Sequence, residues 1–349
     1  MLKTTAIILF PVFGILKFSA VSMLKFLDLA ICRIFSKYLP GHSSLSCFLF
    51  HGVYPDDQAK RSRAIDPEQF ISVADFEKFI RYYLGHGYVF VSPQDVLAGL
   101  SPDKQYAMIT FDDGYYNNQY VLPILKKYQV PAVFFISTAN ILDNKSFWWD
   151  VLYRESVRKN ISQAELHLER KQLKYLKTKE IEKYLMEKFG KASLFPQSDL
   201  DRPFTPAELK EFACEPYVHL GNHTHNHAIL SNYSIQDARA QIHDAQQILS
   251  GLIGKSPDAL SYPNGAYSEG LAKITQEEGI KLAMTTTARK NYFPLGCEKT
   301  GESVLLSRFL LNGSQEITSQ CEIFNSDVSL YLRGKKFFQS LLKIRTFVA

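Results

Sequence analysis

Residues 106–115 read Tyr-Ala-Met-Ile-Thr-Phe-Asp-Asp-Gly-Tyr, an apolar run that ends abruptly in two carboxylates and a glycine. A run of this length predicts a buried strand. In α/β folds the chemistry usually lies at the carboxyl end of such strands, where Asp112 and Asp113 stand. Because side chains alternate along a strand, the two can share a task only if the turn at Gly114 re-aims one. Asp-Gly is also a common turn dipeptide, so the motif alone fits a simple strand end equally well.

A second motif lies at residues 220–227, which read Leu-Gly-Asn-His-Thr-His-Asn-His. It places three of the nine histidines within five residues. One aspartate with His223 and His227 would form a three-ligand site that leaves a position for water, as in catalytic rather than structural zinc sites. We expect His225 to point away from such a site. The alternative for the whole motif is a solvated histidine-rich loop.

Taken together, the segments Thr110-Phe-Asp-Asp-Gly114 and His223-Thr-x-x-His227 resemble the NodB-like polysaccharide deacetylases, carbohydrate esterase family 4. The resemblance spans roughly residues 47–312. It implies an α/β fold, a distorted (β/α) barrel of the polysaccharide deacetylase type. It also implies a hydrolase that removes N-acetyl groups from an amino sugar in a polysaccharide or a lipid-linked glycan precursor.

The resemblance assigns roles to the residues of both motifs. In the family the first aspartate is the general base, and the second binds the metal with the two histidines. Carried over, Asp112 is the base, and one divalent ion such as zinc is bound by Asp113, His223 and His227. Bound zinc lowers the pKa of water from about 16 to roughly 7. Asp112 could then remove a proton from that water at neutral pH.

The third motif of the family departs from its usual form here. Arg-x-Pro-Tyr-Gly normally supplies an arginine that orients the base and a backbone N–H that stabilises the oxyanion. Residues 261–265 read Ser-Tyr-Pro-Asn-Gly, so Asn264 would give the N–H and Ser261 replaces the arginine. Our candidate for the missing partner of the base is Arg308. The alternative for Arg308 is a surface position.

The proton for the leaving amine also needs a different source. The usual late histidine is missing from residues 305–311. Some relatives that act on poly-N-acetylglucosamine supply it from the first strand, and Phe50-His51-Gly52 is similar to that arrangement. We therefore predict His51 as the general acid, with a buried histidine that supports the base as the alternative. The residues predicted to bind substrate are Tyr115, Tyr262 and Pro263.

Two other functions stay compatible with these motifs. One is a deformylase, or another hydrolase of C–N bonds, acting on a lipid-linked sugar. The other is a catalytically inactive glycan-binding subunit, for which the changes at Ser261 and Arg308 leave room. The intact base and ligand set argue against an inactive protein.

The composition favours a globular protein with a large core, since 46% of the 349 residues are hydrophobic. A formal net charge of +5 is too small to predict a nucleic acid partner. Five cysteines without paired spacing indicate reduced thiols and a cytoplasmic location.

Strand and helix patterns alternate along residues 43–325, which predicts parallel strands joined by crossover helices. Further predicted strands cover 45–50, 88–91, 130–137, 217–220, 259–262, 282–285 and 304–311. Helices are expected to begin at Ser72, Ser92, Thr205 and Ser234, and the stripe of the last should contain Ile235, Ala238, Ile242, Ala245 and Leu249. Residues 145–216 predict an insertion of one or two exposed, charged helices. Trp148 and Trp149 at its start could stack on sugar rings or anchor it.

Both ends of the chain are basic and apolar. In residues 1–42 no stretch reaches the ~18 uncharged residues of a spanning helix. We expect a membrane-surface segment there, with a signal peptide or a packed helix as alternatives. Residues 326–349 predict a basic amphipathic helix suited to an anionic membrane surface, or one docked on the barrel. Together the ends predict a peripheral protein on the cytoplasmic face of the inner membrane, with export through an N-terminal signal as the alternative.

Overall fold

The computed structural model describes residues 27–34, 42–62, 65–295 and 303–329. The chain divides into two compact units. The first combines residues 1–42 with 318–349, and the second spans Ser43–Ile317. All the predicted site residues belong to the second unit.

The described part of the first unit is short. Residues 27–34 form a helix, and Nε of Arg33 donates to the carboxylate of Glu322 at 2.9 Å. Across the described ranges, no helix combines the length and the apolar character needed to cross a membrane. The predicted membrane-surface segments fall largely on residues 1–26 and 330–349, which lie outside the described residues.

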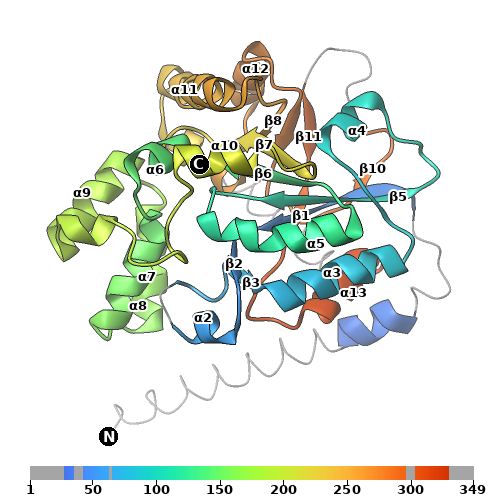
Figure 1. The fold of residues 1–349 in the computed structure, drawn as a ribbon, viewed down its shortest axis with the longest axis horizontal. Coiled ribbons are helices and arrows are strands. Elements are labelled where there is room, and N and C mark those ends of the chain that lie inside the picture. Colours follow the sequence, from blue (N-terminus) through green and yellow to red (C-terminus); the bar gives the residue numbers. More distant parts are fainter. Residues whose placement is uncertain (1–26, 35–41, 63–64, 296–302, 330–349) are drawn as a thin grey trace, which may run out of the picture. The chain divides into compact units, whose positions relative to one another are not determined.

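A ten-stranded sheet forms the centre of the second unit (Figure 1). Its strands are β1 Ser44–Phe50, β4 Val89–Phe90, β5 Gln105–Phe111, β6 Ala132–Ile136, β7 Val218–Asn222, β8 Ala259–Ser261, β9 Leu282–Met284, β10 Asn291–Tyr292, β11 Val304–Leu306 and β12 Arg308–Leu310. The order is β10-β1-β5-β6-β7-β8-β9-β11, with β12 also paired to β1 and β4 to β5. Only the β1–β10 pair is antiparallel among these pairings. A separate pair joins β2 Gly52–Tyr54 to β3 Phe70–Ser72.

The two ends of the sheet are joined through Ser307. The single strand predicted over 304–311 is wrong, because β11 pairs with β9 at one end and β12 pairs with β1 at the other. The side chain of Asn291 explains the break: its Oδ1 accepts from the Ser307 N–H at 2.8 Å and its Nδ2 donates to the Ser307 carbonyl at 3.0 Å. Both backbone groups of Ser307 are thus bonded to a side chain, and the residue belongs to neither strand. The change of partner nearly closes the sheet into the predicted distorted (β/α) barrel.

Helices of the second unit cover the outside of the barrel (Figure 1). Their bounds are α2 Asp57–Arg61, α3 Val73–Gly85, α4 Pro93–Ala98, α5 Leu122–Tyr128, α6 Thr138–Asp143, α10 Pro206–Phe212, α11 Ile235–Ile253 and α12 Glu269–Glu277. Helix α13 Ile317–Asn325, by contrast, falls almost entirely in the first unit. The four predicted capping residues accept hydrogen bonds from the first helical turns, as expected. The predicted stripe of α11 is buried except for Ile235, which is 57% exposed because it sits in the first turn at the edge of that stripe.

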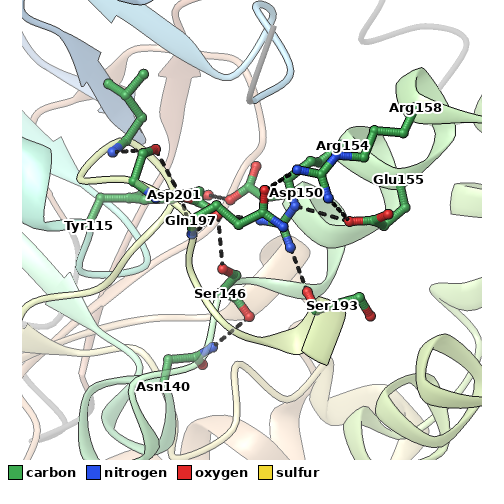
Figure 2. A network of polar contacts seen from close by, with 12 residues as sticks. Tyr115, Asn140, Ser146, Asp150, Arg154, Glu155, Arg158, Ser193, Gln197 and Asp201 are labelled. Carbon is green, nitrogen blue, oxygen red and sulfur yellow. Dashed lines mark hydrogen bonds and ion pairs between the residues drawn. The ribbon is translucent and has the colours of Figure 1, made fainter. Parts of the chain in front are cut away.

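Four α-helices lie within the predicted insertion, residues 145–216, rather than one or two. Besides α10, they are α7 Trp148–Arg158, α8 Gln163–Leu173 and α9 Thr178–Phe189. The helices α7, α8 and α9 enclose a small core of their own, which includes Trp148, Leu166, Leu173, Ile181 and Leu185. A buried ion pair between Arg154 and Asp201 ties α7 to the segment before α10, and Ser146 donates to the same carboxylate (Figure 2). The insertion is therefore a packed subdomain fixed to the barrel, not a solvated pair of helices.

A test of strand packing beside the site uses Gly221 on β7. A Cβ there would lie 2.4 Å from Cδ1 of Phe135 and 3.1 Å from the carbonyl oxygen of Ala259. We expect Gly221→Ala to lower the free energy of unfolding by ~1–3 kcal/mol, measured by urea denaturation. Gly251→Ala on α11 is the matched control, because its Cβ would meet nothing within 4 Å and helix propensity favours alanine by ~1 kcal/mol. Equal stability of the two variants would contradict this account of β7.

Candidate active site

The two sequence motifs meet at the carboxyl edge of the sheet. Asp113 follows β5, and His223 and His227 follow β7. Nε2 of His223 lies 3.4 Å and Nε2 of His227 lies 3.3 Å from Oδ1 of Asp113. One ligand atom from each of the three residues lies within 4.8 Å of the others. The structure thus brings together the three predicted metal ligands.

A left-handed turn separates the two aspartates. Asp113 has φ 82° and Gly114 has φ 94°, a region that residues with a Cβ rarely adopt. The backbone N–H groups of Ser137 and Phe204 donate to the carbonyls of Asp113 and Gly114, at 3.1 and 3.2 Å, and so stabilise the turn. Asp113 faces both histidines, whereas Asp112 has Arg308 as its main partner and only His223 nearby, at 3.8 Å. The two carboxylates therefore have different surroundings.

The surroundings of Asp113 fit a bound cation. Both of its carboxylate oxygens are buried and have no hydrogen-bond partner among the described residues, an arrangement that is costly without a compensating charge. Nδ1 of His223 lies 2.8 Å from the carbonyl oxygen of Ser261. This contact requires the proton on Nδ1, so the lone pair of Nε2 points toward the carboxylate. One carboxylate and two imidazoles are a ligand set that zinc and similar divalent ions accept.

The charge on Asp113 is favoured by its neighbours. Burial raises the pKa of this carboxyl, but the imidazoles of His223 and His227 outweigh burial and hold it well below the usual value. Asp113 is therefore ionised at neutral pH, as a metal ligand must be.

Arg308 lies directly on Asp112. Its Nη1 and Nη2 donate to the two carboxylate oxygens at 2.7 and 2.8 Å, and the residue is fully buried. Ser261 occupies the position of the family's arginine; its hydroxyl donates to Asp112 at 3.0 Å and accepts from Arg308 at 2.7 Å. Burial raises the pKa of Asp112, but the charges of Arg308 and His223 outweigh burial and hold this pKa below its usual value. The carboxyl is therefore ionised. The surface position considered for Arg308 is excluded.

His225 lies outside the ligand group. Its Nδ1 is 2.8 Å from Oγ1 of Thr138, and its backbone N–H donates to the carbonyl of Gln241. His51 and Asn264 both line the cavity above the ligands. Among the described residues, no hydrogen bond joins the imidazole of His51 to Asp112. Burial lowers the pKa of His51 below its ordinary value.

The ligands lie in a cavity of about 490 Å³. Part of its wall comes from the insertion, in the form of Trp148, Trp149, Arg170 and Lys174. The sequence indicated the two tryptophans as possible sugar-stacking residues but not the two cations. In a helix rich in charged residues, the sequence does not show which side chains point toward the cavity. A structure was needed to find Arg170 and Lys174.

The predicted substrate-binding residues are not in the wall. Tyr115 and Tyr262 are fully buried, and Pro263 is buried too. The hydroxyl of Tyr115 donates to Asp150 at 2.5 Å (Figure 2), and that of Tyr262 lies 2.7 Å from Oγ1 of Thr275. Both tyrosines turn inward because buried polar partners satisfy their hydroxyl groups. The structure therefore places these three side chains outside the cavity wall.

Comparison with known proteins gives the family. Residues 99–283 match the model of the polysaccharide deacetylase family. A putative polysaccharide deacetylase of Bacillus subtilis, YxkH, is 22% identical over 217 residues, which cover 61% of this chain and 57% of that protein. The chain thus spans little more than half the length of this curated relative.

Solved structures show the same fold at low sequence identity. The deacetylase PplD of Streptococcus pyogenes, solved with acetate, has a TM-score of 0.54 and 17% identity, over 81% of this chain and 98% of that one. IcaB from Ammonifex degensii has a TM-score of 0.52 and 16% identity, over 82% and 97%. The matched segment contains both aspartates, both ligand histidines and Asn264. This chain belongs to the polysaccharide deacetylase family.

Proposed function

We propose that this protein is a zinc-dependent hydrolase that removes N-acetyl groups from an amino sugar of a glycan. The observation that carries the proposal is the convergence of two differently held carboxylates on one cavity. Asp112 is ionised and fixed by Arg308. Asp113 faces two imidazoles, and its oxygens accept no hydrogen bond from the described residues. These arrangements suit a general base and a metal ligand respectively.

The ligand set would hold the ion through Asp113, His223 and His227. When bound, zinc supplies Lewis acidity and lowers the pKa of water to roughly 7. Asp112 accepts the proton of the water that attacks the acetamide carbonyl. Asp112 accepts two hydrogen bonds from Arg308 and one from Ser261, which leaves room for the water because a carboxylate offers about four acceptor positions.

Two residues in the cavity wall complete the proposed reaction. The backbone N–H of Asn264 donates to the oxyanion that forms at the carbonyl. His51 gives its proton to the leaving amine as the C–N bond breaks, so that acetate and a free amino sugar result. The lack of a bond between His51 and Asp112 supports this role over that of a support for the base.

Trp149 offers an aromatic surface to the sugar. Its ring stacks on Phe147 with an interplanar angle of 14° and contacts His227 edge-on at 4.5 Å between centroids. Its indole N–H donates to the hydroxyl of Tyr115 at 2.9 Å. These contacts fix the ring beside the ligands, so it can pack against a pyranose without first losing side-chain freedom.

The proposed function is tested with protein reconstituted with zinc and a panel of N-acetylated and N-formylated sugars and glycans. We expect acetate release, and a loss of ~10²–10⁴-fold in turnover for Asp112→Asn with the metal retained. Formate release alone would reassign the enzyme as a deformylase. Release of neither acid would favour a glycan-binding protein, and loss of metal in Asp112→Asn but not in Asp113→Asn would reverse the two roles.

The metal assignment predicts a contrast between two histidines of one loop. His227→Ala should weaken zinc binding by at least ~100-fold, because it removes one of three ligands. His225→Ala is the matched control and should bind zinc as the wild type does, since its ring contacts Thr138 instead. Zinc titration with a competing chelator measures both. Equal losses in the two variants would show that the ligand set is wrong.

If His51 is the general acid, its protonation state should shape the pH dependence of the reaction rate. A general acid works only when protonated, so activity should fall as the pH rises through the pKa of His51, which burial lowers. His51→Ala should reduce kcat by ~10²–10⁴-fold and remove this basic limb. His243→Ala serves as the control, because this half-exposed histidine pairs with Glu278 on the outside of the barrel. Wild-type rates across the pH range in His51→Ala would exclude the role.

A further inference from the structure

Two cations of the insertion face the cavity without a role in the proposed reaction. Arg170 lies in the last turn of α8, and Lys174 follows at its C-terminal end. Residues four positions apart lie on the same side of a helix. Both are part of the cavity wall that also holds His51 and the metal ligands.

The guanidinium of Arg170 has donors to spare. Its Nη1 donates to Oδ2 of Asp66 at 2.6 Å, while Oδ1 of Asp66 accepts from the backbone N–H of Glu68 at 3.0 Å. The remaining nitrogens, Nε and Nη2, are buried and have no hydrogen-bond partner in the part of the chain that the structure describes. Asp66 therefore fixes one end of the guanidinium and leaves two donors for another acceptor. Buried charged donors rarely stay unpaired, since desolvation is costly.

Lys174 carries a charge that no ion pair in the described part of the chain compensates. No carboxylate lies within ion-pair distance of its ammonium group among the described residues. Partial desolvation by the surrounding protein and the positive charge of Arg170 both lower the pKa of Lys174. An anion between the two side chains would relieve this repulsion.

The backbone that carries these cations is fixed in place. Nδ2 of Asn232 donates to the carbonyls of Lys174 and Leu176 at 2.9 and 3.0 Å. Oγ1 of Thr178 donates to the carbonyl of Asn226 at 3.0 Å, and Asn226 is the residue before the ligand His227. The turn after α8 is thus held against the histidine loop. The guanidinium of Arg170 and the backbone that carries Lys174 are therefore in place before any ligand arrives, which favours binding.

We infer that Arg170 and Lys174 form a subsite for an oxyanion, a phosphate or carboxylate group, carried by the glycan substrate. The inference rests on the proposed function, because it places the anionic group on the molecule whose amide is cleaved. A guanidinium with two free N–H groups and a neighbouring ammonium match the geometry and charge of such a group. A neutral glycan would leave Nε and Nη2 of Arg170 and the ammonium group of Lys174 without an anionic partner. The preferred substrate is accordingly an anionic amino sugar or glycan.

The test compares sugars that differ in one charged group. The full-length, zinc-loaded protein is titrated calorimetrically with N-acetylglucosamine, its 1-phosphate and 6-phosphate, and the carboxylate-bearing N-acetylmuramic acid. We expect at least one anionic sugar to bind ~10-fold or more tightly than the neutral sugar, as hydrogen bonds to charged groups provide. Added salt should reduce the preference. The phosphorylated and carboxylated probes separate the two sources of the oxyanion.

Variants of the two cations test whether they cause the preference for anionic sugars. Arg170→Gln and Lys174→Gln should each lose most of it and still bind the neutral sugar as the wild type does. Lys171→Gln is the matched control, because this exposed lysine of the same helix does not line the cavity. Lys174→Gln keeps the test valid if loss of the Asp66 contact unfolds Arg170→Gln. A preference that persists in both variants would place the anion elsewhere, at the metal for example, and overturn the inference, as would equal affinity of the wild type for neutral and anionic sugars.

Acetate release is measured on the same sugars, so that the two proposals can fail separately. Deacetylation without any anion preference would preserve the proposed function and remove the subsite. A preference that depends on Arg170 and Lys174 but comes without release of acetate would preserve the subsite and remove the deacetylase.

Discussion

The buried guanidinium of Arg308 links the closure of the barrel to its chemistry. It donates to Asp112 after β5, to the hydroxyl of Ser261 at the end of β8, and to the carbonyl of Thr285 after β9. Arg308 itself begins β12, the strand that completes the sheet beside β1. Burying two charges is favourable only when each is paired and hydrogen-bonded, and removing one partner from such a pair typically costs ~3–5 kcal/mol. The residues that hold the proposed base therefore also hold the two ends of the sheet together.

This dependence explains how the family's arginine can be replaced. The buried carboxylate of Asp112 needs a positively charged partner, but this partner can be carried by any strand whose side chain comes within hydrogen-bond distance. Ser261 at the usual position is too short to provide a charge, yet its hydroxyl contacts both Arg308 and Asp112. The guanidinium instead enters from the opposite end of the sheet, which is possible only because β11 and β12 separate at Ser307. A change of local sequence is thus compensated by the topology.

Sequence reasoning was sufficient where a feature depends on neighbouring residues. The strand before Asp112 and the caps at Ser72 and Ser234 follow from short-range patterns, and the structure contains them. It failed where a partner lies far away in the chain. The break at Ser307 depends on Asn291, sixteen residues earlier, and the inward turn of Tyr115 depends on Asp150, thirty-five residues later. No periodicity reports such contacts, because they form only when the elements pack.

The insertion shows why the most distant contacts matter for function. Its helices α7, α8 and α9 are held by their own apolar core and by the pair of Arg154 with Asp201. Its contribution to the cavity is nevertheless direct, through Trp149 beside His227 and through Arg170. The two proposals thus assign the reacting groups to the strand ends of the barrel and the selectivity for an anionic substrate to the insertion, because the insertion supplies the cavity wall that carries Trp149, Arg170 and Lys174.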